Sequence, residues 1–151
     1  MRTDRRTFIR ASLGAAGGCL VAGSLWARKR RYTRSDIQAL VRDCERRSDD
    51  FRKQLDRALD RSSLDGTRRE DRLNSEARRL ENEIDRVKRE LERREDFMDV
   101  RGNVAAALEA ARDIDRTMRR RRLTKDAERA WRALTAELNV LADRYAVRGL
   151  R

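Results

Sequence analysis

The chain has no histidine and no proline among its 151 residues, and it has only two cysteines. Without histidine, a Ser-His-Asp triad and the common histidine-containing zinc, copper and haem sites are excluded. Two cysteines, Cys19 and Cys44, cannot supply a four-cysteine cluster within one chain. A glycine-rich phosphate loop is also missing. We therefore expect a protein that is not an enzyme and that needs no metal or cofactor.

Aromatic residues are scarce as well, at 5% of the chain, whereas charged residues reach 44%. Such a composition is typical of long helices or coiled coils when apolar residues recur at regular intervals. Without that regularity it would indicate disorder. The spacing of the apolar residues is therefore the observation that decides the fold class.

The net charge of +12 is unevenly distributed along the chain. Residues 1–31 contain eight basic side chains and one acidic one, a net charge of +7. Residues 32–151 contain the other 31 basic and 26 acidic side chains, a net charge of +5. The body of the protein is thus only mildly basic, which weakens a nucleic-acid-binding interpretation.

An arginine pair stands near the amino end, ahead of residues 11–27, which carry no charge and include several glycines. The motif consists of Arg5, Arg6, Phe8, Ile9 and Arg10. It resembles a twin-arginine export signal, in which two arginines, any residue, a large apolar pair and a basic residue precede a mildly apolar segment. The resemblance covers residues 4–27; no family is recognised for the helical body.

The resemblance implies passage through the twin-arginine translocase and a location in the periplasm or at the outer face of the cytoplasmic membrane. Cleavage would follow Ser24 or Ala27, where small residues precede the cut. Alternatively, the basic residues 28–31 hold the uncleaved segment as a membrane anchor.

Apolar or small residues in the body recur at alternating steps of four and three, which predicts helices with heptad-like seams. The first seam includes Ile37, Val41, Cys44, Ser48, Phe51, Leu55, Ala58 and Ser62. The second includes Leu73, Ala77, Leu80, Ile84, Val87 and Leu91, with Arg94 at one position and Met98 completing it. Further stripes run through Val104, Leu108, Ala111, Ile114 and Met118, and through Ala127, Trp131, Leu134, Leu138, Leu141 and Tyr145.

Turn and cap signals separate these stripes. Thr33 or Ser35 is suited to cap the first helix, residues 62–67 form a turn, and Asn103 is suited to cap the third helix. Thr124 indicates a fresh helix start, so that residues 104–148 form two helices rather than one, and Gly149 ends the last. Opposite charges four residues apart on the second helix predict ion pairs at 85/89, 86/90, 88/92 and 90/94.

The expected fold is all-α: an antiparallel helical bundle or a long helical hairpin with coiled-coil-like seams, in three or four helices after an N-terminal signal helix. We divide the chain into a signal or anchor (1–27), a basic linker (28–33) and a helical domain (34–149). The polar seam residues Ser48, Ser62 and Arg94 suggest self-association or a helical partner.

Two features of the body are candidates for function. Cys44, on the first seam, is either a small core side chain or the site of a disulfide between two copies in an oxidising compartment. The strongest basic cluster is a solvated helix end or a contact site for lipid headgroups, envelope polymer or nucleic acid. It consists of Arg116, Arg119, Arg120, Arg121, Arg122 and Lys125.

The leading hypothesis is therefore an exported structural or protein-interaction module that is not an enzyme. The alternative is a basic helical protein that binds nucleic acid or another anionic surface through residues 116–125. Nucleic acid is the weaker choice, because no aromatic residues are interleaved with the arginines for base stacking. Trp131 and Tyr145 fit the last apolar stripe and are expected in the core or at an interface.

Overall fold

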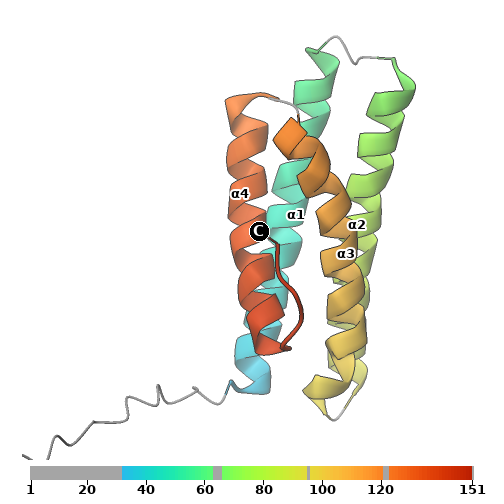
Figure 1. Cartoon of the computed structure of the whole chain (residues 1–151). Helices are drawn as coiled ribbons and strands as arrows, with labels where there is room; N and C mark the ends of the chain where they lie inside the picture. Colours follow the sequence, from blue (N-terminus) through green and yellow to red (C-terminus); the bar gives the residue numbers. More distant parts are fainter. Residues whose placement is uncertain (1–31, 63–65, 95, 121–122, 151) are drawn as a thin grey trace, which may run out of the picture. The chain divides into compact units, whose positions relative to one another are not determined.

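The computed structural model of the chain describes residues 32–62, 66–94, 96–120 and 123–150, and within these ranges the protein is all-α without strands. The elements are α1 (Arg34–Asp60), α2 (Arg68–Arg93), the short 3-10 helix η1 (Phe97–Val100), α3 (Arg101–Arg120) and α4 (Lys125–Arg144). The four α-helices run alternately up and down (Figure 1). The all-α prediction and the break within residues 104–148 are confirmed. The proposed signal lies outside the described residues.

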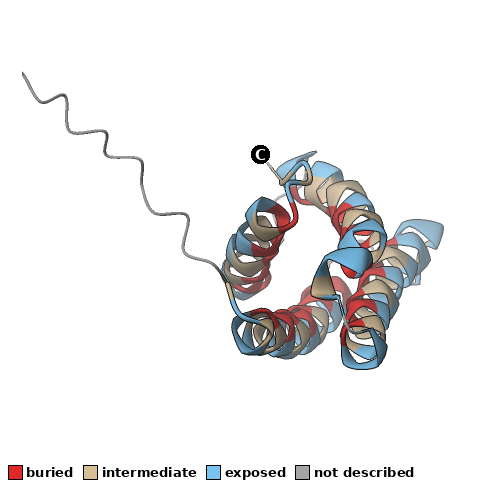
Figure 2. Ribbon diagram, turned by 90° about the horizontal axis from the view of Figure 1, so that it is seen from below, coloured by how far each residue is buried: buried red, intermediate tan, exposed pale blue. Residues whose placement is uncertain are grey.

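Each α-helix buries the stripe that its apolar spacing predicts. The buried side chains of α1 and α2 include Ile37, Val41, Cys44, Phe51, Leu55, Leu73, Leu80, Ile84, Val87 and Leu91. The stripes of all four helices face one another across a shared core (Figure 2). Burying each large apolar side chain stabilises the fold by about 1.5–3 kcal/mol, which far exceeds what intrinsic helix propensity can supply.

Threonine caps begin three of the helices. The Thr33 hydroxyl accepts from the backbone N–H of Asp36 at 3.2 Å, and the Asp36 carboxylate accepts from the Thr33 N–H at 2.9 Å. Thr124 accepts from the N–H of Ala127 in the same way at 3.3 Å. Thr67 caps α2 after a turn that includes Gly66 at φ +70°. The predicted caps at Thr33 and Thr124 are therefore confirmed.

The helices form a bundle in which each packs against two neighbours. α1 packs against α2 and α4, and α2 packs against α3. The α3–α4 interface is the least extensive of the four. The bundle is thus closed on three sides and weakly closed on the fourth.

Several boundary predictions are wrong. α2 ends at Arg93, so Arg94 is its C-cap rather than a seam residue. Met98 lies in η1 and is 44% exposed, so it does not complete the second seam. Asn103 lies inside α3 and does not cap it, because the preceding turn is a 3-10 helix that leads directly into α3. That turn is capped by Asp96, whose carboxylate accepts from the N–H of Met98 at 2.8 Å.

The core is more complete than the polar residues on the predicted seams suggest. Ser48 is buried at 3% exposure and is the one buried polar side chain among the described residues. Ser62 lies beyond the end of α1, and its hydroxyl donates to the carbonyl of Leu59 at 2.9 Å. The polar positions that suggested an incomplete core therefore lie mostly outside it.

Of the four predicted pairs on α2, one forms among the described residues: Arg94 Nε lies 3.1 Å from Glu90 Oε2. Lys88 instead reaches across to α1, where its Nζ lies 2.8 Å from Glu45 Oε1. Arg86 pairs with Glu83, one turn earlier. Bridges between helices thus replace some of the bridges expected within one helix, since neighbouring helices bring other acids into reach.

Candidate functional site

The weakly closed side of the bundle, between α3 and α4, is held by a tryptophan. Trp131 on α4 is 4% exposed and packs against Phe51 of α1, with ring centroids 4.8 Å apart. Its indole Nε1 donates to Asp115 Oδ1 of α3 at 3.2 Å. A single side chain therefore links three helices, and its bulk lies where α3 and α4 would otherwise meet.

Beyond α4 the chain turns back between α3 and α4 (Figure 1). Residues 146–150, here called the C-terminal tail, are held from α3 by Arg101, whose Nη2 donates to the Ala146 carbonyl at 3.0 Å. Arg112 of α3 donates to the carbonyl of Arg148. From α4, Asn139 Oδ1 accepts from the N–H of Leu150 at 2.6 Å. The tail therefore fills one part of the gap between the two helices.

Gly149 lies close to the Asn139 side chain of α4. A Cβ placed there would lie 2.7 Å from Asn139 Oδ1, which is shorter than a van der Waals contact. The sequence predicted that Gly149 ends the last helix, and this is wrong: α4 ends at Arg144 with Tyr145 as its C-cap. The glycine serves instead to bring the tail against α4.

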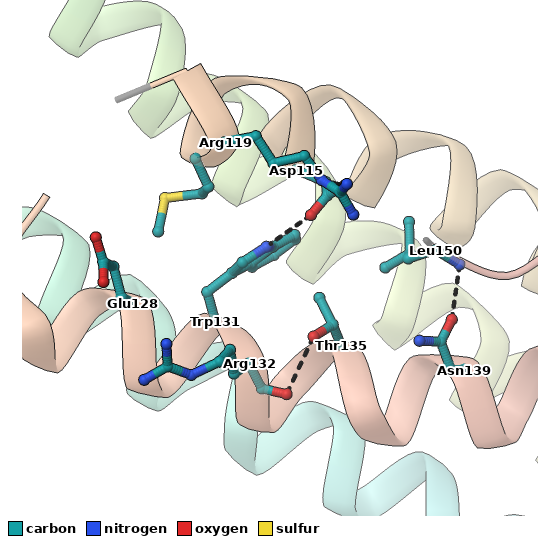
Figure 3. A pocket seen from close by; sticks show the side chains of 9 residues that line it. Asp115, Arg119, Glu128, Trp131, Arg132, Thr135, Asn139 and Leu150 are labelled. Atoms are coloured by element: carbon teal, nitrogen blue, oxygen red, sulfur yellow. Dashed lines mark hydrogen bonds and ion pairs between the residues drawn. The ribbon is translucent and has the colours of Figure 1, made fainter. Parts of the chain in front are cut away.

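The rest of the gap is a cavity of about 380 Å³, here called the α3–α4 groove. Its lining residues are Asp115, Met118, Arg119, Glu128, Trp131, Arg132, Thr135, Asn139 and Leu150. Figure 3 shows Trp131 between the two helices, with Arg119 on the α3 side and Arg132 on the α4 side. Volumes of this size are typical of ligand-binding clefts in proteins.

A second hollow of about 250 Å³ shares Asp115, Arg119 and Leu150 with the groove and extends along α3 past Arg112, Arg116 and the tail. The two hollows therefore lie next to each other, beside the tail.

The charged side chains that line the groove are two basic and two acidic ones, and they are only partly paired. Arg119 Nε lies 2.7 Å from Asp115 Oδ2, so this carboxylate is shared between the arginine and the indole of Trp131. Arg132 on the opposite wall has no ion-pair partner among the described residues, and neither has Glu128. The groove thus combines an apolar floor with one guanidinium and one carboxylate group on each wall.

The structure brings together part of the predicted basic cluster. Arg116, Arg119 and Arg120 lie on the last turns of α3, and Lys125 begins α4. Arg116 pairs with Asp113, as Arg119 does with Asp115, whereas Arg120 and Lys125 are exposed and make no ion pair within the described part of the chain. Arg121 and Arg122 lie outside the described residues.

Cys44 is fully buried in the core, and burial raises the pKa of its thiol to about 12. Glu137 and Asp43 add a smaller effect in the same direction. A thiolate is the species that attacks a disulfide or an oxidant, so the folded chain keeps this sulfur in its least reactive form. The structure places Cys44 as a small core side chain. A disulfide between two copies stays a prediction, and it would require local opening of the bundle.

Tyr145 confirms the expectation of a core role for the last aromatic residue. It is 1% exposed, and its hydroxyl donates to the carbonyl of Phe97 at 3.0 Å. Burial raises the pKa of this phenol to about 12. Tyr32, at the start of the described chain, lies in the segment that the sequence assigned to a linker. The guanidinium carbon of Arg144 lies 3.3 Å from the centroid of its ring.

The groove itself was not predicted. The sequence assigns Arg119 to a basic cluster and Trp131 to the core, but it does not indicate that they are neighbours in one site. The available signal was the apolar pair Val147 and Leu150 beyond the end of the last stripe, since an apolar segment outside a helix must find cover elsewhere. The export motif Arg5, Arg6, Phe8, Ile9 and Arg10 lies outside the described residues.

Comparisons of the chain with protein-family models, with curated proteins and with solved structures find no match. None of the helices in the described ranges is long and apolar enough to cross a membrane. The same ranges contain no cluster of three or more side chains suited to hold a metal ion.

Proposed function

We propose that the chain is an exported interaction module, not an enzyme, that binds a protein partner through the α3–α4 groove. The observation that carries the proposal is the combination of a closed core with one recess that has an apolar floor and charged walls. Apolar recesses with a few placed polar groups are where proteins usually bind ligands, and apolar grooves also bind segments of partner proteins. We also propose that the apolar side chains of the four-three seams interdigitate as in a coiled coil. This packing would keep the helices that form the walls of the groove rigid.

Self-association along the seams has less support than a separate partner. The seams of α1 and α2 are already buried within the chain, so they offer no apolar stripe to a second copy. The groove remains accessible, and we place the partner there.

The export part of the proposal rests on the motif at the amino end and is tested by Arg5→Lys/Arg6→Lys. This double variant should accumulate in the cytoplasmic fraction, since the twin-arginine route requires the arginine pair. Arg30→Lys/Arg31→Lys makes the same chemical change outside the motif and should be exported normally. Unchanged export of the first variant would contradict the proposal. The mass of the mature amino terminus distinguishes cleavage after Ser24 or Ala27 from an uncleaved anchor.

The docking part is tested in cells by a photo-crosslinking amino acid at Thr135, which lines the groove. The neighbouring Ala136 is exposed and does not line it, so the same amino acid there is a matched control. A discrete protein adduct from position 135 and not from position 136 supports the proposal. The same adducts from both positions, or none from position 135, would contradict it.

Binding to an anionic surface is a second candidate, favoured by the exposed Arg120 and Lys125 at one end of the bundle, which form no ion pair among the described residues. Phosphatidylglycerol vesicles should retain the protein, and Arg120→Gln/Lys125→Gln should weaken retention more than Arg78→Gln/Arg89→Gln, an equal charge change on exposed positions of α2. Equal retention of both variants would refute it. A DNA duplex at low salt provides the nucleic-acid comparison, because such binding falls steeply as salt rises.

A further inference from the structure

Residues 148–150, the far part of the C-terminal tail, are held between α3 and α4 by few contacts. Among the described residues two hydrogen bonds hold their backbone: Arg112 donates to the carbonyl of Arg148, and Asn139 Oδ1 accepts from the N–H of Leu150 at 2.6 Å. Leu150 is their one large apolar side chain, and it is partly buried. Arg148 is exposed and makes no ion pair within the described ranges.

The near part of the tail is anchored independently of these contacts. Arg101 donates to the carbonyl of Ala146 at 3.0 Å, and the N–H of Val147 donates to the carbonyl of Ala142 at 3.0 Å. Release of residues 148–150 therefore breaks two hydrogen bonds and exposes one partly buried side chain, whereas unfolding of the bundle exposes the whole core. Segments with so few contacts open locally far more often than the fold as a whole.

The same residues lie between the two hollows beside the tail. Leu150 lines both the α3–α4 groove and the second hollow, which Arg148 and Gly149 line as well. Figure 3 shows Leu150 at the edge of the groove, where its N–H is bonded to Asn139 of α4. Because α3 and α4 make the least extensive interface of the bundle, the tail contributes to closing this stretch of the gap. Its release would join the two hollows into one longer recess without movement of a helix.

We propose that residues 148–150 form a displaceable strap, which leaves the gap between α3 and α4 while the four α-helices stay folded and which restricts access to the groove when it is docked. The docked strap is then an autoinhibitory contact, because it occupies space that a partner would use. This consequence rests on the proposed function, whereas the release itself does not depend on it.

A disulfide can hold the strap in place and free it again within one full-length chain. A Cβ at position 149 would lie 3.6 Å from Asn139 Cγ. Cysteines in the double variant Asn139→Cys/Gly149→Cys therefore come within reach of the separation that a disulfide needs. The oxidised chain keeps the strap docked. Reduction frees it, and the reduced chain also lacks the side-chain acceptor for the Leu150 N–H.

Quenching of Trp131 fluorescence by acrylamide measures access to the groove, which Trp131 lines. Trp26→Phe leaves Trp131 as the only tryptophan, and Cys19→Ser leaves Cys44, which is buried, as the only other thiol. Acrylamide should quench the reduced chain more strongly than the oxidised one, while circular dichroism shows the same helix content in both. The chain with the two background substitutions alone should not respond to the reductant.

Gly149→Val frees the strap without a disulfide. The added Cβ would lie 2.7 Å from Asn139 Oδ1, the atom that accepts from the Leu150 N–H. Gly102→Val is the matched control, because a Cβ at Gly102 has nothing within 4 Å. Hydrogen exchange followed by mass spectrometry should become about five- to tenfold faster at residues 148–150 in Gly149→Val, the factor for one lost hydrogen bond. Exchange along α2 should not change, and Gly102→Val should leave the strap at the parent's rate.

Three results would overturn the proposal. One is equal quenching of Trp131 in the oxidised and reduced chains. Another is loss of helix content on reduction or in Gly149→Val, because the strap would then be part of the cooperative core. The third is exchange at residues 148–150 that is as slow as in the buried part of α4, in the parent and in Gly149→Val alike.

The photo-crosslinking amino acid at Thr135 separates this inference from the proposed function. A larger yield of the protein adduct in Gly149→Val than in Gly102→Val supports the autoinhibitory role of the strap. An equal yield in both would refute that role and leave the groove as the docking site. No adduct from either chain would contradict the proposed function, while quenching and exchange still decide whether the strap is displaced.

Discussion

Ala146 adopts a backbone conformation that residues with a side chain avoid, and this makes it the sharpest position for a stability test. It comes directly after the C-cap Tyr145 at φ 48°, in the left-handed region. The N–H of Val147 donates to the carbonyl of Ala142 at 3.0 Å, and the N–H of Ala146 donates to the carbonyl of Asp143 at 3.4 Å. These two bonds define a Schellman motif, whose left-handed position is usually glycine.

The magnitude is set by two opposing effects. The left-handed conformation costs a residue with a Cβ about 1–2 kcal/mol, and glycine is free of this cost. Glycine also gives the unfolded chain more freedom, which lowers stability by about 0.4–1 kcal/mol. Ala146→Gly should therefore raise the free energy of unfolding by about 0.5–1 kcal/mol, or the unfolding midpoint by roughly 2–4 °C for a domain of this size.

Thermal unfolding monitored by circular dichroism provides the measurement. Ala105→Gly is the matched control, because Ala105 lies inside α3 and glycine there should cost about 1 kcal/mol. The two identical substitutions are thus expected to shift the midpoint in opposite directions. If Ala146→Gly lowered the midpoint as the control does, the inference that position 146 carries backbone strain would be refuted.

Four further predictions concern the core and the titratable groups. Leu138→Ala removes a fully buried side chain and should lower the free energy of unfolding by about 2–5 kcal/mol in chemical denaturation. In a Cys19→Ser chain, Cys44 should resist iodoacetamide until the protein is unfolded, and rapid native alkylation would contradict its burial. Hydrogen bonds from Thr33 lower the pKa of Asp36, so Asp36→Asn should lower the free energy of unfolding at neutral pH. The difference between the variant and the parent should disappear as acid protonates the parent's carboxylate. Desolvation raises the pKa of Glu76, so Glu76→Gln should raise the free energy of unfolding at neutral pH, and this gain should vanish as pH falls through the raised pKa. A gain in stability that does not depend on pH would refute desolvation of the carboxylate as its cause.

The helices could be predicted from the sequence because their causes are local. A stripe repeating every four and three residues can be buried only by a helix, and Thr33 and Thr124 can each cap only the helix that begins directly after them. Met98 fitted the same spacing but lies off the helix, since Asp96 caps a 3-10 turn before the next α-helix begins. Periodicity carried past the true end of a helix was therefore the main error.

The groove could not be predicted, because its causes are tertiary. It depends on where Trp131 holds α4 relative to Asp115, and on the return of the tail between two helices. Gly149 illustrates the difficulty: glycine beyond a helical stripe indicates a helix end, whereas here its missing side chain permits contact with Asn139. The same residue type serves both purposes, and only the neighbour across the gap distinguishes them.

The order in which the bundle closes bears on the proposed export route. Contacts of α1 with α2 and of α2 with α3 join neighbours in sequence, whereas α1 meets α4 only when the whole helical region is present. The groove needs α4 and the tail, so it is complete only in the folded chain. The twin-arginine route serves proteins that fold before they cross, and a bundle dominated by local contacts is expected to fold rapidly. If the chain is exported by that route, the groove is already formed when it reaches the outer side. The tail then already fills its part of the gap between α3 and α4.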